Sequence, residues 1–139
     1  MAKALSNSIP ADLAESLIPI PAKKGAGGII YGPNIPGGYV TGLSTGAGGS
    51  GASHPVVEDL YTKVPINQRS NYHRKCAEAS MLSEISFAAD VKSIEDLKKV
   101  VEYSTSVVYN SKREYKIPCP SCELVLDLLK IAYKQEGEN

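Results

Sequence analysis

The pattern of apolar and polar positions predicts short strands and amphipathic helices along most of the chain. Two β-prone runs, 28–31 and 39–43, flank a turn rich in proline and glycine and predict a hairpin. A third β-prone run covers 104–109, and 131–134 is a candidate last strand. Apolar residues at helical spacing predict helices over 56–64, 77–89, 93–103 and 119–130.

Local signals place these helices in the fold. Pro55 suits the first position of the helix over 56–64, and Pro65 ends it. The helix over 77–89 carries small and apolar residues around most of its circumference, which is typical of a helix buried against a sheet. The order of elements predicts an α/β sandwich with a mixed sheet of about four strands and helices packed on it.

The N-terminal part differs in composition from the rest. Prolines and a Lys-Lys-Gly-Ala-Gly-Gly run predict a flexible tether over 1–27, although 11–17 can form a short helix. The compact domain is expected over 28–139. The Gly- and Ser-rich segment 44–53 predicts a mobile loop, either a plain linker or the lining of a substrate mouth. It lacks the Gly-Lys-Ser/Thr ending of a phosphate-cradling loop.

Bulk properties narrow the class of protein. The 139 residues suffice for one domain with its own core. The formal net charge is zero, so overall charge does not indicate a nucleic-acid binder. No apolar run approaches the roughly 18 residues of a membrane helix, and no signal peptide is recognisable. Basic residues nevertheless gather in 63–77 and 112–122, which predicts either a positive rim around a pocket or scattered solvated lysines.

The cysteines carry the chemical signal. All three lie in two short segments, with Cys76 in Cys-Ala-Glu and with Cys119 and Cys122 in Pro-Cys-x-x-Cys. Each segment begins a predicted helix, where the helix N-terminus favours a thiolate. An odd and small number of cysteines argues against a disulfide scaffold. Three thiols with Glu78 nearby predict a zinc site with one position left open, as in catalytic rather than structural zinc sites.

Cys-Ala-Glu followed by Pro-Cys-x-x-Cys resembles the zinc-dependent nucleoside and nucleic-acid deaminases, in which a glutamate is the general acid and base. The wider context is most similar to the YwqJ-like group of bacterial polymorphic-toxin deaminases. In that group a Ser/Gly-rich stretch, a His-Pro and an Arg precede Lys-Cys-Ala-Glu and Pro-Cys-x-x-Cys. The resemblance covers roughly residues 38–130. The matching residues are Ser53, His54, Pro55, Arg69, Lys75, Cys76, Ala77, Glu78, Pro118, Cys119, Pro120, Ser121 and Cys122.

The resemblance implies hydrolytic deamination of cytosine in a nucleic acid, on a single-stranded or flipped-out base. Cys76, Cys119 and Cys122 would bind Zn²⁺, which lowers the pKa of a bound water, and Glu78 would take and return protons. Candidate substrate contacts are Ser44, His54, Arg69, Tyr72, Ala77 and Tyr115. The resemblance also implies a secreted toxin effector domain, delivered to a target-cell cytoplasm by elements outside this chain and matched by a cognate immunity protein.

Other interpretations of the same residues stay open. His73 with the three cysteines would give a closed structural zinc site in a non-catalytic interaction module, and Glu78 would then be an ordinary acid. A redox Cys-x-x-Cys is a third interpretation, in which Cys76 has no role. His54 is more often a local capping residue than a ligand. The sequence leaves open cytosine or adenine, DNA or RNA, and a free nucleoside.

Overall fold

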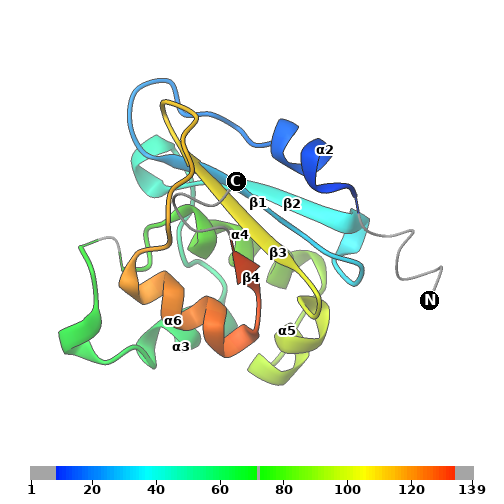
Figure 1. Ribbon diagram of the computed structural model, residues 1–139. Coiled ribbons are helices and arrows are strands. Elements are labelled where there is room, and N and C mark those ends of the chain that lie inside the picture. The colour runs from blue at the N-terminus through cyan, green and yellow to red at the C-terminus, as the bar shows by residue number, and fades with distance from the viewer. Residues whose placement is uncertain (1–8, 72, 134–139) are drawn as a thin grey trace.

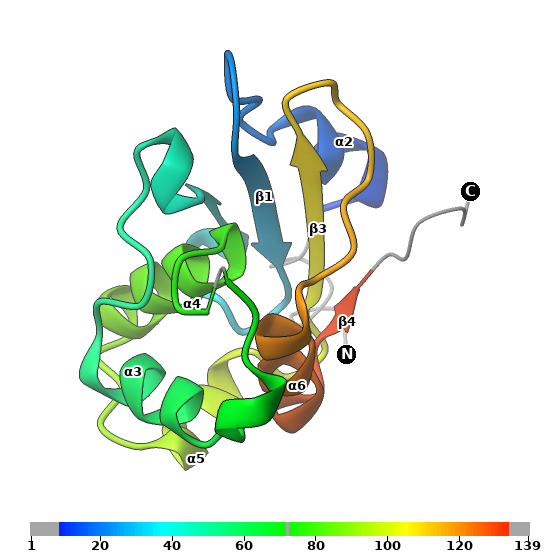
Figure 2. The same cartoon turned by 90° about the vertical axis from the view of Figure 1, so that its left-hand side faces the viewer.

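A four-stranded mixed sheet with helices on both faces forms the fold (Figures 1 and 2). The computed structural model describes residues 9–71 and 73–133. The strands are β1 (Ala26–Tyr31), β2 (Tyr39–Leu43), β3 (Thr105–Asn110) and β4 (Ala132–Tyr133), in the spatial order β2-β1-β3-β4. The central strand β1 pairs antiparallel with β2 and β3, whereas β3 and β4 pair in parallel.

The predicted hairpin is confirmed as β1 and β2. Its register runs from Gly27 opposite Leu43 to Tyr31 opposite Tyr39. The Gly32 N–H donates to the Gly38 carbonyl at 3.0 Å and closes the connection, which contains the 3₁₀ turn Pro36–Gly38. Pairing to β3 on the other side of β1 makes the hairpin part of a larger sheet.

The helices lie on both sides of this sheet. Figure 1 shows α2 (Ala11–Ser16) on one face, and α3 (Pro55–Thr62), α4 (Ala77–Ala88), α5 (Ile94–Val100) and α6 (Pro120–Leu129) on the other. Two further 3₁₀ turns cover Thr45–Ala47 and Ile66–Gln68. The expected α/β architecture, with a mixed sheet of about four strands and helices packed on it, is therefore confirmed.

The main core lies between the sheet and helices α3 to α6. Helix α4 occupies its centre, against β1 and β2, and Met81, Leu82 and Ile85 are fully buried. The helix is buried on nearly all sides, because the sheet covers one side and α3 another. This explains its ring of small and apolar residues. It also means that groups at its N-terminal end are held by a rigid element.

The predicted tether over 1–27 is wrong for its described part. Helix α2 packs on the outer face of the sheet, where Ala14 and Ile18 form a second small core with Ile29 and Val107. Strand β1 already begins at Ala26, before the predicted domain start at residue 28. The sheet has an apolar face on each side, so a short apolar helix is needed to cover the second one.

The surroundings of Gly27 show how closely the segment between α2 and β1 approaches the sheet. A side chain at Gly27 would collide with the carbonyl of Pro19. The chain between α2 and β1 therefore lies directly against the strand, and only glycine fits there.

The sequence predicts a mobile loop over 44–53. In the structure this segment is hydrogen-bonded to residues just before α4 and to α4 itself. The Thr45 N–H donates to the Lys75 carbonyl and the Ala52 N–H to the Arg74 carbonyl, both at 2.9 Å. The Gly51 N–H donates to Ser80 Oγ at 2.7 Å. A side chain at Gly49 would collide with the Leu43 carbonyl, so the glycine content reflects close packing at this position.

Candidate metal centre

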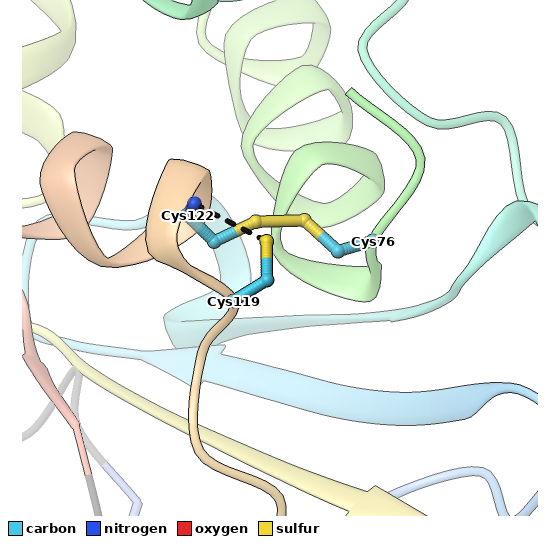
Figure 3. A group of neighbouring side chains, drawn as sticks. All are labelled: Cys76, Cys119 and Cys122. Atoms are coloured by element: carbon cyan, nitrogen blue, oxygen red, sulfur yellow. Dashed lines mark hydrogen bonds between the residues drawn. A yellow bond between two sulfur atoms is a disulfide. The ribbon is translucent and has the colours of Figure 1, made fainter. Parts of the chain in front are cut away.

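The three cysteine sulfurs come together between α4 and α6 (Figure 3). The ligand atoms of Cys76, Cys119 and Cys122 all lie within 4.8 Å of one another. Over residues 9–71 and 73–133, no other group of three or more His, Cys, Asp or Glu side chains has this geometry. The expectation that these cysteines form one cluster is confirmed, and the cluster can hold a metal ion.

Local sequence explains why the sulfurs converge. Cys76 is the extended residue that precedes α4, and Cys119 holds the same position before α6. Pro120 occupies the start of α6, and Cys119 Sγ accepts the Cys122 N–H at 3.5 Å (Figure 3). Both helices therefore direct their N-terminal ends at the cluster. The partial positive charge of a helix N-terminus stabilises thiolates, the form in which sulfur binds metals.

The sulfurs of Cys76 and Cys122 lie at disulfide distance, and Cys119 is a free, half-buried thiol. The Cα atoms of Cys76 and Cys122 are 7.4 Å apart. Disulfides usually span roughly 4.4–6.8 Å between Cα atoms. The pair at disulfide distance is therefore Cys76 and Cys122, whereas the redox interpretation of Cys-x-x-Cys pairs Cys119 with Cys122.

A cavity of about 530 Å³ opens beside the cluster. Cys76, Ala77, Glu78 and Cys119 contribute to its wall. The remaining lining residues are Lys24, Gly25, Ala26, Ser44, Thr45, Gly46, Asn71, Lys75, Val108, Lys116 and Ile117. The volume falls within the roughly 300–1,000 Å³ of small-molecule sites.

Glu78 contributes the carboxyl group of this cavity. It lies in the first turn of α4 with 3% of its surface exposed. Burial raises its pKa, while the hydrogen bond from its own backbone N–H and the charge of Lys116 act in the opposite direction. Glu78 is the one acidic residue in the described lining, so the carboxyl lies among cations and neutral groups.

Two predicted substrate contacts line the cavity. Ser44 and Ala77 are both in its wall, and Ser44 Oγ accepts the Ala26 N–H at 2.9 Å. Ala77 is fully buried beside Cys76. These two residues therefore stay candidates for contacts with a bound molecule.

His54 and Arg69 have structural roles instead. His54 Nδ1 accepts the Val56 N–H at 3.1 Å as the N-cap of α3, and its ring packs edge-on against Phe87. The Arg69 guanidinium donates to the carbonyls of Val64 and Thr62, at the end of the same helix. Neither residue is in the cavity lining, so the prediction that they contact substrate there is not supported by their positions.

Tyr115 lies with α2 on the other face of the sheet. Its hydroxyl donates to Glu15 Oε1 at 2.7 Å, and its ring packs against Tyr109. A bridge between Tyr109 and Tyr115 directs the residue to this side, which corrects its assignment as a substrate contact. Tyr72 lies outside the described residues.

His73 is close to the cluster but is not part of it. Its Nδ1 lies 2.8 Å from Ser121 Oγ, and its ring meets Tyr61 edge-on. Partial burial, Arg69 and Arg74 lower its pKa. Within the described chain, the four-ligand arrangement of three cysteines and one histidine is therefore not formed.

Three residues of the site were not singled out from the sequence. The Tyr61 hydroxyl lies 3.1 Å from Cys122 Sγ and 3.7 Å from Cys76 Sγ. Lys24, in the segment predicted to be a tether, and Lys116, in the basic segment 112–122, both line the cavity. The one sequence signal for Tyr61 is that a tyrosine lies on the apolar face of the predicted helix. A buried tyrosine hydroxyl usually needs a hydrogen-bond partner.

Comparisons with known proteins give no match to this chain. No protein-family model matches it, and neither the curated proteins nor the solved structures contain a match. Within residues 9–71 and 73–133, no helix combines the length and apolarity needed to cross a membrane.

Proposed function

We propose that the protein is a zinc-dependent hydrolytic deaminase acting on cytosine in a nucleic acid. One observation carries this proposal: a buried carboxyl group, Glu78, shares a cavity wall with Cys76 and Cys119 of the three-sulfur cluster. The resemblance of Cys-Ala-Glu and Pro-Cys-x-x-Cys to the deaminase signature gives this arrangement its chemical interpretation.

The donor set fits zinc. Cysteine thiolates are preferred ligands of this ion, at Zn–S distances of about 2.3 Å. A metal ion between Cys76 and Cys122 also accommodates their 7.4 Å Cα separation better than a direct bond does. Cys76, Cys119 and Cys122 would hold the ion and leave one position for water, and a bound zinc ion would lower the pKa of that water.

Glu78 is suited to the proton transfers of the reaction. Its place two residues after Cys76 sets the carboxyl beside the cluster, and the packing of α4 fixes the helix that carries it. In the proposed reaction the carboxylate accepts a proton from water. The same group then donates this proton to the ring nitrogen of the base. After the water oxygen has added to the ring carbon that bears the amino group, the carboxylate takes the second proton from that oxygen and donates it to the departing ammonia.

The charge of the cavity favours an anionic substrate. Lys24, Lys75 and Lys116 line it, against the single acid Glu78. Lysines of this kind contact phosphates and position a nucleic acid without selecting its sequence. Asn71 and Ser44 add neutral hydrogen-bonding groups to the same wall. A nucleobase attached to its phosphate backbone therefore suits the cavity better than a neutral free base.

Incubation with single- and double-stranded DNA and RNA, followed by sequencing, tests the proposal. We expect C-to-T changes in DNA, or C-to-U changes in RNA, with the wild-type protein. Glu78→Ala should lower the rate by at least about 100-fold, because general acid–base catalysis typically contributes about 10²–10⁴-fold. The variant should still bind zinc.

Glu84→Ala is the matched control, because Glu84 lies on the same helix but is exposed. It should leave deamination unchanged. Full activity of Glu78→Ala would refute the role of Glu78 in proton transfer. A wild-type protein that binds zinc but changes no base in any substrate would instead favour a non-catalytic interaction module.

A further inference from the structure

Tyr61 brings a polar group into the middle of the main core. The residue is fully buried on α3, beside Val57, Leu60 and Val64 of the same core. Burying a hydroxyl without a hydrogen-bond partner is unfavourable, so the position of this group needs an explanation. Among the described residues, its hydroxyl makes hydrogen bonds with two sulfur atoms, Cys122 Sγ at 3.1 Å and Cys76 Sγ at 3.7 Å.

The two sulfurs belong to different helices. Cys122 lies in the first turn of α6, and Cys76 immediately precedes α4. Tyr61 comes from a third helix and reaches both with one oxygen atom. Its ring cannot turn away, because His73 packs edge-on against it with ring centroids 5.5 Å apart and the rest of the side chain is enclosed. The phenol is therefore fixed in relation to both ligands.

Metal binding defines the direction of these hydrogen bonds. A cysteine that binds a metal does so as a thiolate, which has no proton to give. Only the Tyr61 hydroxyl can then act as the donor. Hydrogen bonds to an ionised acceptor are about twice as strong as those between neutral groups. The same contact draws electron density from sulfur, which makes the thiolate a weaker electron donor and offsets part of its charge.

We propose that Tyr61 is a positioning residue of the metal centre. Its hydroxyl shares one proton between the thiolate of Cys122, the nearer acceptor, and that of Cys76, and so holds both sulfurs for one metal ion. Three thiolates on a divalent cation leave one net negative charge, and α3 supplies a hydrogen-bond donor against it. This inference rests on the metal-binding part of the proposed function and is independent of deamination.

Tyr61→Phe tests the inference, because it removes one oxygen atom and keeps the ring. Groups that hydrogen-bond to metal ligands typically contribute about 10–100-fold to metal affinity. We expect Tyr61→Phe to weaken zinc binding by about tenfold or more, measured by competition with a chromophoric chelator. In the cobalt-substituted protein, the sulfur-to-cobalt charge-transfer band should move to lower energy, because the thiolates lose a hydrogen bond.

Tyr109→Phe is the matched control. It removes a buried hydroxyl that donates to Glu15 at 2.8 Å on the other face of the sheet. Zinc affinity and the cobalt band should match those of the wild type. A second variant with 3-fluorotyrosine at position 61 keeps the ring and makes the hydroxyl a stronger donor. It should retain zinc affinity and move the band to higher energy.

The outcomes separate two failures. If the wild-type protein binds no metal, the proposed function fails together with this inference. If the wild type binds zinc but Tyr61→Phe keeps its affinity and its cobalt spectrum, only the role of Tyr61 is refuted. Should Tyr61→Phe fail to fold, the fluorotyrosine variant decides, and an unshifted charge-transfer band would overturn the inference.

Discussion

Two side chains decide whether the metal centre is open or closed. Glu78 lies in the cavity wall next to Cys76, whereas His73 is hydrogen-bonded to Ser121 and lies outside the sulfur cluster. A catalytic zinc site needs a ligand position for water and an acid beside it, while a structural site fills all four positions. The placement of these two residues favours the open arrangement.

His73→Ala should therefore keep its metal. The imidazole is hydrogen-bonded to Ser121 Oγ at 2.8 Å and adds no ligand to the three-sulfur group. We expect one zinc ion per chain after purification and extensive dialysis, as in the wild type. Cys119→Ser should lower the zinc content, because it removes one of three ligands. Loss of zinc from His73→Ala would support the closed structural site.

Local spacing made the cysteine cluster predictable, because Cys-x-x-C at a helix start and Cys-x-Glu at another leave few possible arrangements. Residues that reach the site from distant parts of the chain were not predictable in this way. Tyr61 comes from α3 and Lys24 from the segment before β1, and no local pattern reports that both lie beside Cys76. For the same reason the short spacing between Tyr115 and Cys119 did not reveal that Tyr115 packs with α2 on the other face of the sheet.

Helix α2 shows how a short element becomes part of the domain. Glu15 Oε1 accepts hydrogen bonds from the hydroxyls of Tyr109 at 2.8 Å and Tyr115 at 2.7 Å. Ala14 and Ile18 add buried apolar surface on the same face. The proline content of this segment indicated a tether. A helix as short as α2 gives no clear periodic pattern of apolar residues. The sequence alone therefore did not reveal that this helix packs on the sheet.

Glu15→Ala should destabilise the protein by about 2 kcal/mol, because hydrogen bonds to charged groups contribute roughly 1.5–3 kcal/mol. Urea unfolding followed by circular dichroism measures this change. Asp12→Ala is the control on the same helix, since Asp12 is exposed and accepts a hydrogen bond from the N–H of its neighbour Leu13. Equal effects of the two substitutions would contradict a specific role of Glu15.

Alkaline pH should weaken the hydrogen bond between Tyr109 and Glu15. Burial, together with the hydrogen bonds to Glu15 and Tyr115, raises the pKa of Tyr109. A raised pKa in the folded state means that this stabilisation is fully present below the unfolded value of about 10. It is lost as the pH rises above that value. The urea midpoint should fall between about pH 9 and pH 11, and by less in Tyr109→Phe than in the wild type.

The cysteine cluster joins two helices that the main core already holds together. Cys76 begins α4 and Cys119 begins α6, and both helices pack in the main core through residues such as Met81, Ile85 and Leu126. We expect a core of this size to fold without a metal ion, in contrast to small zinc modules that unfold without it. The alternation of elements along the chain was sufficient to predict this sandwich, because sheet and helices must bury complementary apolar faces.

Chelation of zinc should therefore lower the melting temperature without abolishing the fold. At free zinc about 1,000 times Kd, binding contributes roughly 4 kcal/mol. In a domain of this size that corresponds to a fall on the order of 10 °C. Circular dichroism with and without a chelator measures it, and Cys119→Ser should respond less. Complete unfolding of the chelated protein at room temperature would point to a structural zinc module instead.

X-ray absorption spectroscopy of the zinc-loaded protein examines the open three-sulfur centre itself. We predict three sulfur atoms at about 2.3 Å and one oxygen at about 2.0 Å, without the outer-shell scattering of an imidazole ring. A fourth ligand with imidazole scattering, or a protein that takes up no zinc while Cys76 and Cys122 stay disulfide-bonded, would contradict the proposed metal centre.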